Sequence, residues 1–381
     1  MQSPGTRYRA VDALRGLIMM IMAVDHAGAY IARQHGAEFW AGAMSYYTDA
    51  FPFLTRWITH LCAPGFFFLM GAGVYWSTAS TALRSDAVRR TLWRGFVLFV
   101  TAQLLETPLI FLSNLQKPAA VRVNMITAPP PVDGTELYWG LIVLSALGLV
   151  TMVCALMLWL RPWAWLVISV LCVVATNSLL PESGKPGGLL MTVLLAPGIS
   201  QHLIAIYPVI PWLAGAAAGM YFGYWWRKNP DDAGRRVWIL GLTLLVIGIA
   251  VRAAGGWGNI RLPRDTGWIE FLNNVKYPPS LVFWTMSLGI DLLLLALLVR
   301  LPEFFKSDRS PLLVFGQTPL FFYVLHLYVL LGCGLLFFRE ASSLEVAWVV
   351  WAVALVALYP LCLWYRDFKL SKPKESVWRL F

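Results

Sequence analysis

Few ionisable side chains interrupt the long apolar segments of this 381-residue sequence, and those few define its candidate chemistry. An ionisable group in hydrocarbon costs about 3 kcal/mol or more, so each one is a functional hypothesis. Arg15 and His26 are eleven positions apart, which is three helical turns, so they share a face about 16 Å apart along the axis. A cation at one level and a titratable imidazole at another suit a long anionic substrate that reacts near the histidine.

Further histidines occur in the same kind of surroundings. His60 follows Arg56 by one turn, His326 follows Tyr323 by three residues, and His35 lies in the loop after the first apolar segment. Histidine is the usual residue for proton transfer near neutral pH. Asp25 lies on a neighbouring face from His26, so we expect it to bind a group on another helix rather than the His26 ring. The sequence predicts a catalytic set drawn from His26, Asp25, His60, His326 and His35.

The composition excludes an ordinary soluble protein and indicates a bilayer as the solvent. Hydrophobic residues make up 59% and charged residues 13% of the chain, against about 45–50% and about 25% in soluble domains. We predict an all-α polytopic membrane protein that forms one domain over residues 1–381, with about ten spans. The predicted spans cover residues 11–31, 54–80, 91–112, 137–160, 162–181, 206–226, 237–254, 280–300, 312–338 and 346–365.

The net charge of +10 is explained by membrane topology rather than by nucleic-acid binding. With the N-terminus inside, 19 Lys and Arg residues fall on the inner side and 10 on the outer side. The positive-inside rule therefore predicts cytoplasmic N- and C-termini in the cytoplasmic (inner) membrane. The longer outer loops, at 32–53, 113–136, 182–205 and 255–279, are expected to roof the site. The first apolar segment reads as a retained helix, because no cleavage site follows it.

Other features favour structural roles. The five cysteines show no metal-binding spacing, so we expect neither a disulfide framework nor a metal site. Gly215, Gly219 and Gly223 form a stripe for close helix packing, within one chain or in a homo-oligomer. For Glu106 and Asp291 the simpler reading is that each neutralises a buried Arg or Lys. For Arg15 the simpler reading is that it extends to the lipid phosphates of the inner face or pairs with Asp12.

Two ordered blocks of sequence, RYRAVDALRGLIMMIMAVDH and LTRWITHLCAPGFFFLMGAG, resemble the family that contains the catalytic domain of heparan-α-glucosaminide N-acetyltransferase, in its bacterial branch. The later blocks IYPVIPWLAGAAAGMYFG, KYPPSLVF and FGQTPLFFYVLHLYVLL extend the likeness from about residue 8 to the end. The first segment is also similar to acyltransferase-three type O-acyltransferases, whose Arg or Lys, ten residues, then His signature matches Arg15 and His26.

The resemblance implies a membrane acyltransferase that moves an acetyl group from cytoplasmic acetyl-CoA to a sugar or amino-sugar acceptor outside. His26 would be the general base and Arg15 would hold the donor. In the glucosaminide enzyme the catalytic histidine lies in the first outer loop, where this chain has His35, so His26, His35 and His60 compete for the role. The residues expected to bind the acyl donor are Arg15, Arg56, Lys276 and Tyr323.

A secondary transporter or permease for a small polar solute is the alternative. In that reading Asp291, Glu106 and His326 would relay protons, and the proline-broken helices would form a midplane site. Transporters of this kind are typically built from two inverted repeats. The sequence shows no such repeat.

Overall fold

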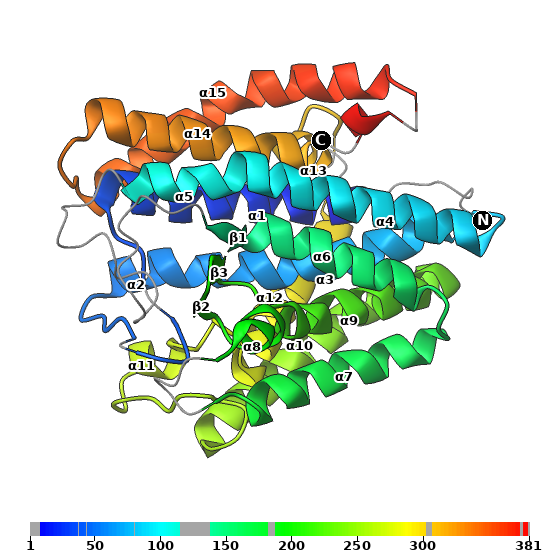
Figure 1. The fold of residues 1–381 in the computed structure, drawn as a ribbon, viewed down its shortest axis with the longest axis horizontal. Helices are drawn as coiled ribbons and strands as arrows, with labels where there is room; N and C mark the ends of the chain where they lie inside the picture. Colours follow the sequence, from blue (N-terminus) through cyan, green and yellow to red (C-terminus); the bar gives the residue numbers. More distant parts are fainter. Residues whose placement is uncertain are drawn as a thin grey trace.

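The computed structural model describes residues 8–36, 38–42, 44–79, 81–114, 138–181, 187–301, 307–373 and 376–379. Helices dominate this part of the chain, and most of them run roughly parallel in one bundle (Figure 1). The predicted outer loop at 113–136 lies outside the described residues from residue 115 on, as do residues 182–186 of the next one. The all-α prediction is confirmed, with the addition of one small sheet.

Each of the ten predicted apolar segments overlaps described helix. Three of the segments combine helices of different pitch in one continuous rod. The first is α1 (Arg9–Ala27) with the π turn η1 (Gly28–Ala32), and the second is α2 (Ala50–Trp57), the 3₁₀ turn η2 (Ile58–Leu61) and α3 (Cys62–Thr78). The third is α4 (Arg84–Thr101), the π turn η3 (Ala102–Glu106) and α5 (Thr107–Asn114). The other long helices are α6 (Val143–Met157), α7 (Pro162–Ser178), α9 (Val209–Lys228), α10 (Pro230–Ala254), α12 (Leu281–Arg300), α14 (Pro319–Phe337) and α15 (Leu344–Leu370).

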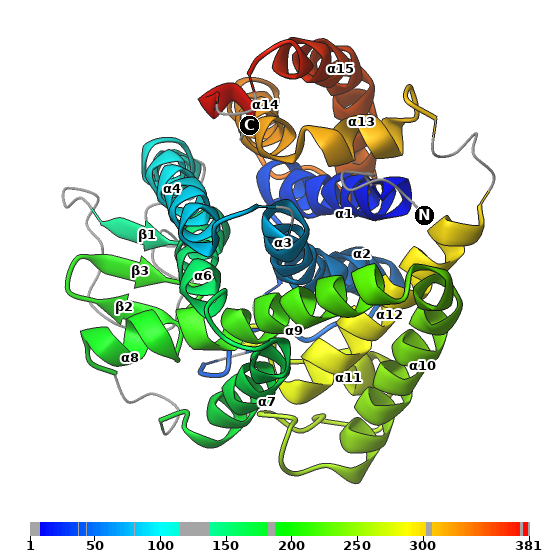
Figure 2. The ribbon, with the colours of Figure 1, turned by 90° about the vertical axis from the view of Figure 1, so that its right-hand side faces the viewer.

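Short elements complete the described chain. They are the helices α8 (Leu189–Leu194), α11 (Trp268–Leu272) and α13 (Pro311–Gln317), and a 3₁₀ turn, η6 (Val377–Arg379). A three-stranded sheet has the order β1 (Trp139–Leu141), β3 (Leu203–Ala205), β2 (Gly198–Ser200). Strand β1 pairs parallel to β3 with Gly140 opposite Ile204, and β2 pairs antiparallel to β3. The sheet lies at the edge of the bundle beside α6 (Figure 2).

Six stretches of helix are long and apolar enough to cross a bilayer, among the residues that the structure describes. These six are Arg9–Ala32, Ala50–Thr78, Gly234–Ala254, Leu281–Arg300, Pro319–Phe337 and Leu344–Leu370. Two shorter apolar helices, α6 and α7, accompany them. The chain is therefore a helical membrane protein, whereas a count of ten spans and the side on which the termini lie stay predictions.

Helix α1 lies at the centre of one half of the bundle and packs against α3, α12, α13, α14 and α15. The other principal pairs are α3 with α9, α4 with α6, α7 with α9 and α10 with α12. Figure 2, which looks along the bundle, shows α14 and α15 on one side of α1, and α7 and α10 on the far side of α9. Helix α1 is thus in contact with five other helices, which suits the polar side chains that it carries.

The two ends of the bundle differ in chemistry. At the basic end, where α1 begins and α9, α12 and α15 finish, Arg9 pairs with Asp308 at 3.0 Å and Lys369 bonds the Gln317 carbonyl at 2.9 Å. At the loop end, loops 33–49 and 255–280 meet, and Arg33 bonds the Phe338 carbonyl at 3.3 Å. The segments that the sequence assigns to opposite faces of the membrane are therefore separated along the bundle axis.

Glycines permit two unusually close helix contacts. A Cβ on Gly219 would lie 1.9 Å from the Phe68 carbonyl oxygen of α3, so the predicted glycine stripe of α9 serves packing within this chain. A Cβ on Gly316 of α13 would lie 1.8 Å from the Asp12 carbonyl oxygen of α1, and one on Gly16 would lie 1.8 Å from the Leu312 carbonyl oxygen. Side chains at these positions would separate the helices, which fixes α13 directly beside Arg15.

Candidate active site

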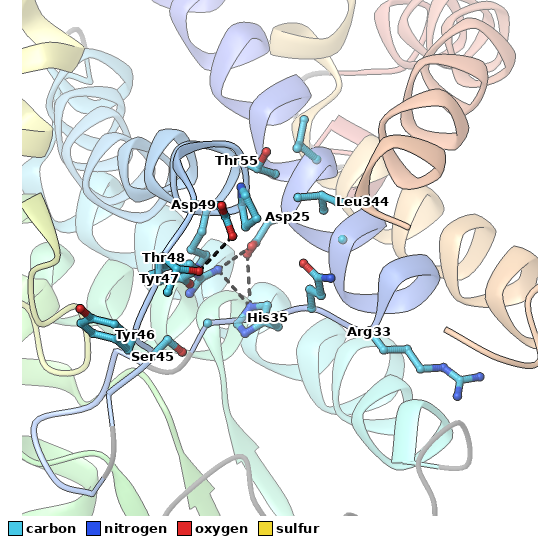
Figure 3. A pocket seen from close by; sticks show the side chains of 16 residues that line it. Asp25, Arg33, His35, Ser45, Tyr46, Tyr47, Thr48, Asp49, Thr55 and Leu344 are labelled. Atoms are coloured by element: carbon cyan, nitrogen blue, oxygen red, sulfur yellow. Dashed lines mark hydrogen bonds and ion pairs between the residues drawn. The ribbon is translucent and has the colours of Figure 1, made fainter. Parts of the chain in front are cut away.

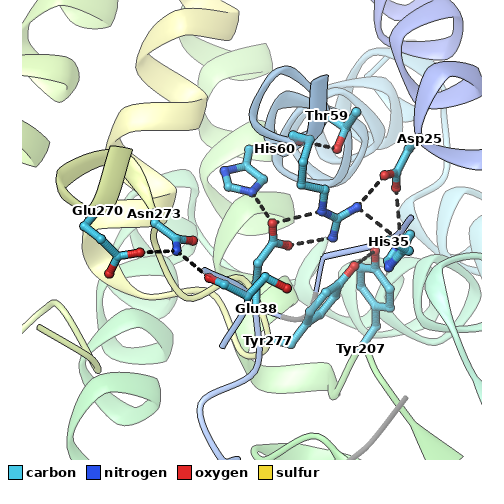
Figure 4. A network of polar contacts seen from close by, with 11 residues as sticks. Asp25, His35, Glu38, Thr59, His60, Tyr207, Glu270, Asn273 and Tyr277 are labelled. Atoms are coloured by element: carbon cyan, nitrogen blue, oxygen red, sulfur yellow. Dashed lines mark hydrogen bonds and ion pairs between the residues drawn. The ribbon is translucent and has the colours of Figure 1, made fainter. Parts of the chain in front are cut away.

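A buried polar network at the loop end is centred on Glu38 (Figure 4). Arg56 of α2 binds its carboxylate with two bonds, from Nε to Oε1 at 2.9 Å and from Nη2 to Oε2 at 2.6 Å. His60 Nε2 lies 2.7 Å from Oε1. On its other side, Arg56 Nη1 donates to Asp25 Oδ1 of α1 at 2.5 Å. Asp25 thus binds a group on another helix, as its position in the sequence predicted.

The charges in this network compensate one another. Burial alone would raise the pKa of Glu38, but the Arg56 guanidinium and His60 hold that pKa well below its usual range. Lys276, only 3% exposed, also contributes, and its ammonium lies 5.2 Å from the centre of the Tyr277 ring. Removal of one partner would leave a buried charge without compensation, which is the costly case for buried ion pairs.

The backbone of the Glu38 loop is held by the second long loop. The Lys276 and Tyr277 amides donate to the Glu38 carbonyl at 3.0 and 3.1 Å, and the Trp40 amide donates to the Tyr277 carbonyl at 2.8 Å. Arg264 extends this clamp with bonds to the Met44 and Ser45 carbonyls at 3.0 and 2.7 Å. Residues far apart in sequence therefore fix the position of Glu38.

A polar pocket of about 470 Å³ opens at the loop end above this network (Figure 3). Asp25 and His35 face it, with His35 Nε2 3.3 Å from Asp25 Oδ2 and 3.1 Å from Arg56 Nη1. The one Nε2 atom accepts from Arg56 when it carries no proton and donates to Asp25 when it does. The lining also includes Tyr46 and Tyr47, and burial raises the pKa of Tyr47 to about 12, so it stays a neutral hydroxyl. Hydroxyls, carboxylates and aromatic rings together suit a polar, hydroxylated ligand. We call this the outer pocket.

Two histidines from different helices form a second centre deeper in the bundle. His26 Nδ1 of α1 lies 2.8 Å from His326 Nε2 of α14. His326 Nδ1 lies 2.8 Å from the Phe322 carbonyl oxygen, which is only an acceptor. His326 Nδ1 therefore carries a proton, and in a neutral ring its Nε2 is the acceptor. The hydrogen between the two rings then belongs to His26 Nδ1, and His26 Nε2 is left with a lone pair.

A third feature is a cavity of about 240 Å³ that α1 lines nearer to the basic end of the bundle than the two histidines. Arg15, Arg94 and Tyr323 line it, with apolar side chains of α3 and α6. Arg15 Nη1 bonds Asp12 Oδ1 at 3.1 Å and the Gly316 carbonyl at 2.9 Å, so the predicted pair with Asp12 is confirmed. Although it makes these two bonds, the Arg15 side chain still lines the cavity. We call this the inner cavity.

The simpler reading of Glu106 and Asp291 was wrong about their partners. Glu106 receives a bond from the Tyr323 hydroxyl and one from the Leu144 amide at 3.1 Å, so its partners are neutral. Asp291 is 1% exposed, and neither carboxylate oxygen has a hydrogen-bond partner among the described residues. A Cβ on Gly65 would lie 3.0 Å from Asp291 Oδ2, which places this carboxyl against α3.

The structure distributes the predicted site residues over three places. The loop-end network contains or adjoins Asp25, His35, His60, Arg56 and Lys276. The histidine pair consists of His26 and His326. The inner cavity is lined by Arg15 and Tyr323. The predicted donor set is therefore divided, with Arg56 and Lys276 apart from Arg15.

Exposure separates the histidines further. His60 and His326 are 3% and 0% exposed, whereas His26 is partly exposed and the His35 side chain is 28% exposed. His26 and His35 therefore keep accessible surface, and of these two His35 is the one that lines the outer pocket.

Sequence reasoning missed Glu38, Tyr207 and Tyr277. The Tyr207 and Tyr277 hydroxyls lie 3.2 Å apart beside the network. All three residues lie outside the predicted spans or at their ends, where an acid or a tyrosine is unremarkable. The available signal for Glu38 was its position three residues after His35 in a loop already expected to roof the site.

The fold and this arrangement define a helical membrane protein with polar centres buried along one helix. The sequence model of the family described as "Heparan-alpha-glucosaminide N-acetyltransferase, catalytic" matches residues 7–253, and the chain belongs to that family. The match covers α1 to α10 and stops before the blocks that contain Lys276 and His326. A search of curated proteins found no match.

Proposed function

We propose that the chain is a membrane acetyltransferase that takes an acetyl group from acetyl-CoA at the inner cavity and transfers it to a hydroxyl or amine in the outer pocket. Membership in the acetyltransferase family supports the reaction class. The proposal depends on one observation: helix α1 presents Arg15 to the inner cavity and Asp25 to the outer pocket, with His26 of the histidine pair next to Asp25.

The inner cavity has the chemistry for an acyl-CoA. Guanidinium groups bind phosphate oxygens strongly through charge-assisted bonds, and Arg15 and Arg94 bring two of them to one cavity. The remaining lining is mostly apolar, which suits the uncharged arm that carries the thioester. Such a lining also keeps water away from the acyl group.

His26 is the proposed general base. Its Nε2 would take the proton from the acceptor hydroxyl or amine as that oxygen or nitrogen attacks the thioester carbonyl. The C–S bond then breaks, and the proton passes from the imidazolium to the leaving CoA thiolate, so no net proton is consumed. His326 is a positioning residue in this scheme, because its bond to the Phe322 carbonyl sets which nitrogen of His26 is free.

The outer pocket is the proposed acceptor site. Its hydroxyl and carboxylate groups match a sugar or amino sugar, and the lining carboxylates of Asp25 and Asp49 can accept hydrogen bonds from a hydroxyl or an amine. His35 contacts Asp25 at the mouth of the network and is the competing candidate for the base.

The direct test measures transfer of labelled acetyl from acetyl-CoA to amino-sugar and neutral sugar acceptors by purified protein in nanodiscs. His26→Ala is expected to lower kcat at least 100-fold while acetyl-CoA still binds. His35→Ala is expected to raise KM for the acceptor with a smaller effect on kcat.

The reverse pattern, with kcat lost in His35→Ala and kept in His26→Ala, would assign the base to His35. Uptake of a solute into proteoliposomes, together with no acyl transfer to any acceptor, would overturn the acyltransferase proposal and favour transport.

A further inference from the structure

A large cavity lies away from all three centres, beside α9 and α12. It is a groove of about 800 Å³ between α7 and α10, floored by α9 and α12. Figure 2 shows α7 and α10 standing apart on this side of the bundle. Helix α7 packs on α9 and α10 packs on α12, so the side chains between the two pairs remain uncovered.

The groove walls are apolar along the depth of the membrane. Val170 of α7 and Ile239 of α10 line it and are 56% and 48% exposed. Helix α10 is one of the six stretches long and apolar enough to span a bilayer, and only 22% of its most apolar part is buried. The groove therefore faces lipid rather than water.

Each end of the groove carries a side chain suited to a membrane boundary. Arg236 is the only charged residue among its described lining and lies near the start of α10, at the basic end. Trp257 follows the end of α10, and its Nε1 donates to Ser178 Oγ at the end of α7 at 3.0 Å. The 18 residues that follow Arg236 to the end of α10 rise about 27 Å, close to the thickness of the hydrocarbon core.

We propose that this groove binds an anionic phospholipid, whose phosphate lies on Arg236 and whose acyl chain lies between α7 and α10. Charge complementarity decides the headgroup, because Arg236 is the one charged side chain in the described lining of the groove and it is a cation. A Lys or Arg that meets an anionic headgroup contributes about 1 kcal/mol of attraction. The inference does not depend on the acetyltransferase proposal.

The test compares lipids bound to protein purified in mild detergent, by native mass spectrometry after exchange with phosphatidylglycerol or phosphatidylcholine. We expect retention of phosphatidylglycerol over phosphatidylcholine. Arg236→Gln is expected to lower that retention about fivefold or more. Arg235→Gln changes the same charge one position away, outside the groove, and is expected to leave retention within twofold.

A second variant tests the apolar part. Thr243→Trp fills the groove from α10 without changing charge and is expected to displace the lipid. Arg236→Lys is expected to restore part of the preference for phosphatidylglycerol. Equal retention by Arg236→Gln and Arg235→Gln, equal retention of the two lipids, or undiminished binding in Thr243→Trp would each overturn the proposal. Far-UV circular dichroism shows whether each variant is folded.

Discussion

His26 Nδ1 lies 2.8 Å from His326 Nε2, although the two residues are 300 positions apart in the chain. His326 in turn bonds the carbonyl of Phe322 one turn before it on α14. The backbone of α14 thus orients a side chain on α1, and the orientation leaves His26 Nε2 as a proton acceptor. Catalysis is therefore expected to depend on His326.

Substitution of His326 by Leu is expected to lower kcat for acetyl transfer about 100-fold, because His26 loses the partner that fixes its tautomer. Substitution by Gln keeps an oxygen that accepts from His26 Nδ1, so His326→Gln is expected to retain more activity than His326→Leu. Steady-state kinetics over a range of pH measure both variants.

A merely structural role predicts a different result. If His326 only fills space, His326→Leu keeps the pH profile and kcat of the wild type, and Gln, which buries an amide, is the worse replacement. That order of activities would contradict the assigned role.

Arg15→Gln is expected to raise KM for acetyl-CoA about tenfold or more, with a smaller change in kcat. The reason is the loss of one charge-assisted contact to the donor, worth about 1.5–3 kcal/mol. Arg9→Gln is the matched control, since Arg9 lies on the same helix but pairs with Asp308 at the surface. An unchanged KM for acetyl-CoA in Arg15→Gln would remove the inner cavity as the donor site.

The sequence predicted the parts of the fold that depend on hydrophobicity and on helix periodicity. Each predicted apolar segment overlaps helix, and the Gly219 stripe packs closely, because lipid exposure and helix contact leave a direct mark on residue type. The same logic identified His26 and His326 as candidates, since histidine is rare in a span. That these two rings touch was not predictable, because α1 and α14 are far apart in the sequence and their relative register is set by the packing of the whole bundle.

Glu38 shows why the rest of the site was missed. Its partners Arg56 and His60 come from the next helix, and its backbone is held by residues 276 and 277, more than 200 positions away. Nothing local distinguishes it from a solvated loop acid. Arg56 and Lys276 were grouped with Arg15 as residues that bind the acyl donor, because all three are cations. In the structure Arg56 and Lys276 lie beside Glu38 at the loop end, whereas Arg15 lines the inner cavity.

Glu38→Gln is expected to lower the free energy of unfolding by about 3 kcal/mol, because Arg56 would be left buried without one of its two carboxylate partners. Glu340→Gln is the control, since Glu340 is an exposed acid at the same end of the bundle. Denaturant unfolding in a single detergent compares the two. Similar stability for both variants would show that the network contributes little.

Acid should remove the same contribution from the wild type. The pKa of Glu38 is below its usual range in the folded protein, so its stabilisation is complete above the unfolded pKa of about 4.3 and declines as pH falls below it. Between pH 6 and pH 3 the wild type is therefore expected to lose more stability than Glu38→Gln. Parallel curves for the two proteins would contradict this account.

Glu270→Gln is expected to loosen the roof of the outer pocket. Burial raises the pKa of Glu270, but its bonds from Arg264 and Asn273 lower it overall, and Arg264 also holds the Met44 and Ser45 carbonyls of the facing loop. Without the carboxylate, Arg264 loses its ion pair with Glu270 and holds the facing loop less firmly. Amides at 38–46 should therefore exchange with deuterium faster, while those in α12 stay protected. Wild type should behave in the same way once the pH falls through the lowered pKa of Glu270 in the folded protein, below the usual glutamate value of about 4.3, because the brace is then protonated. The same variant should raise KM for the acceptor a few-fold without changing KM for acetyl-CoA. Unchanged exchange at 38–46 in Glu270→Gln would show that the loops hold together without this brace.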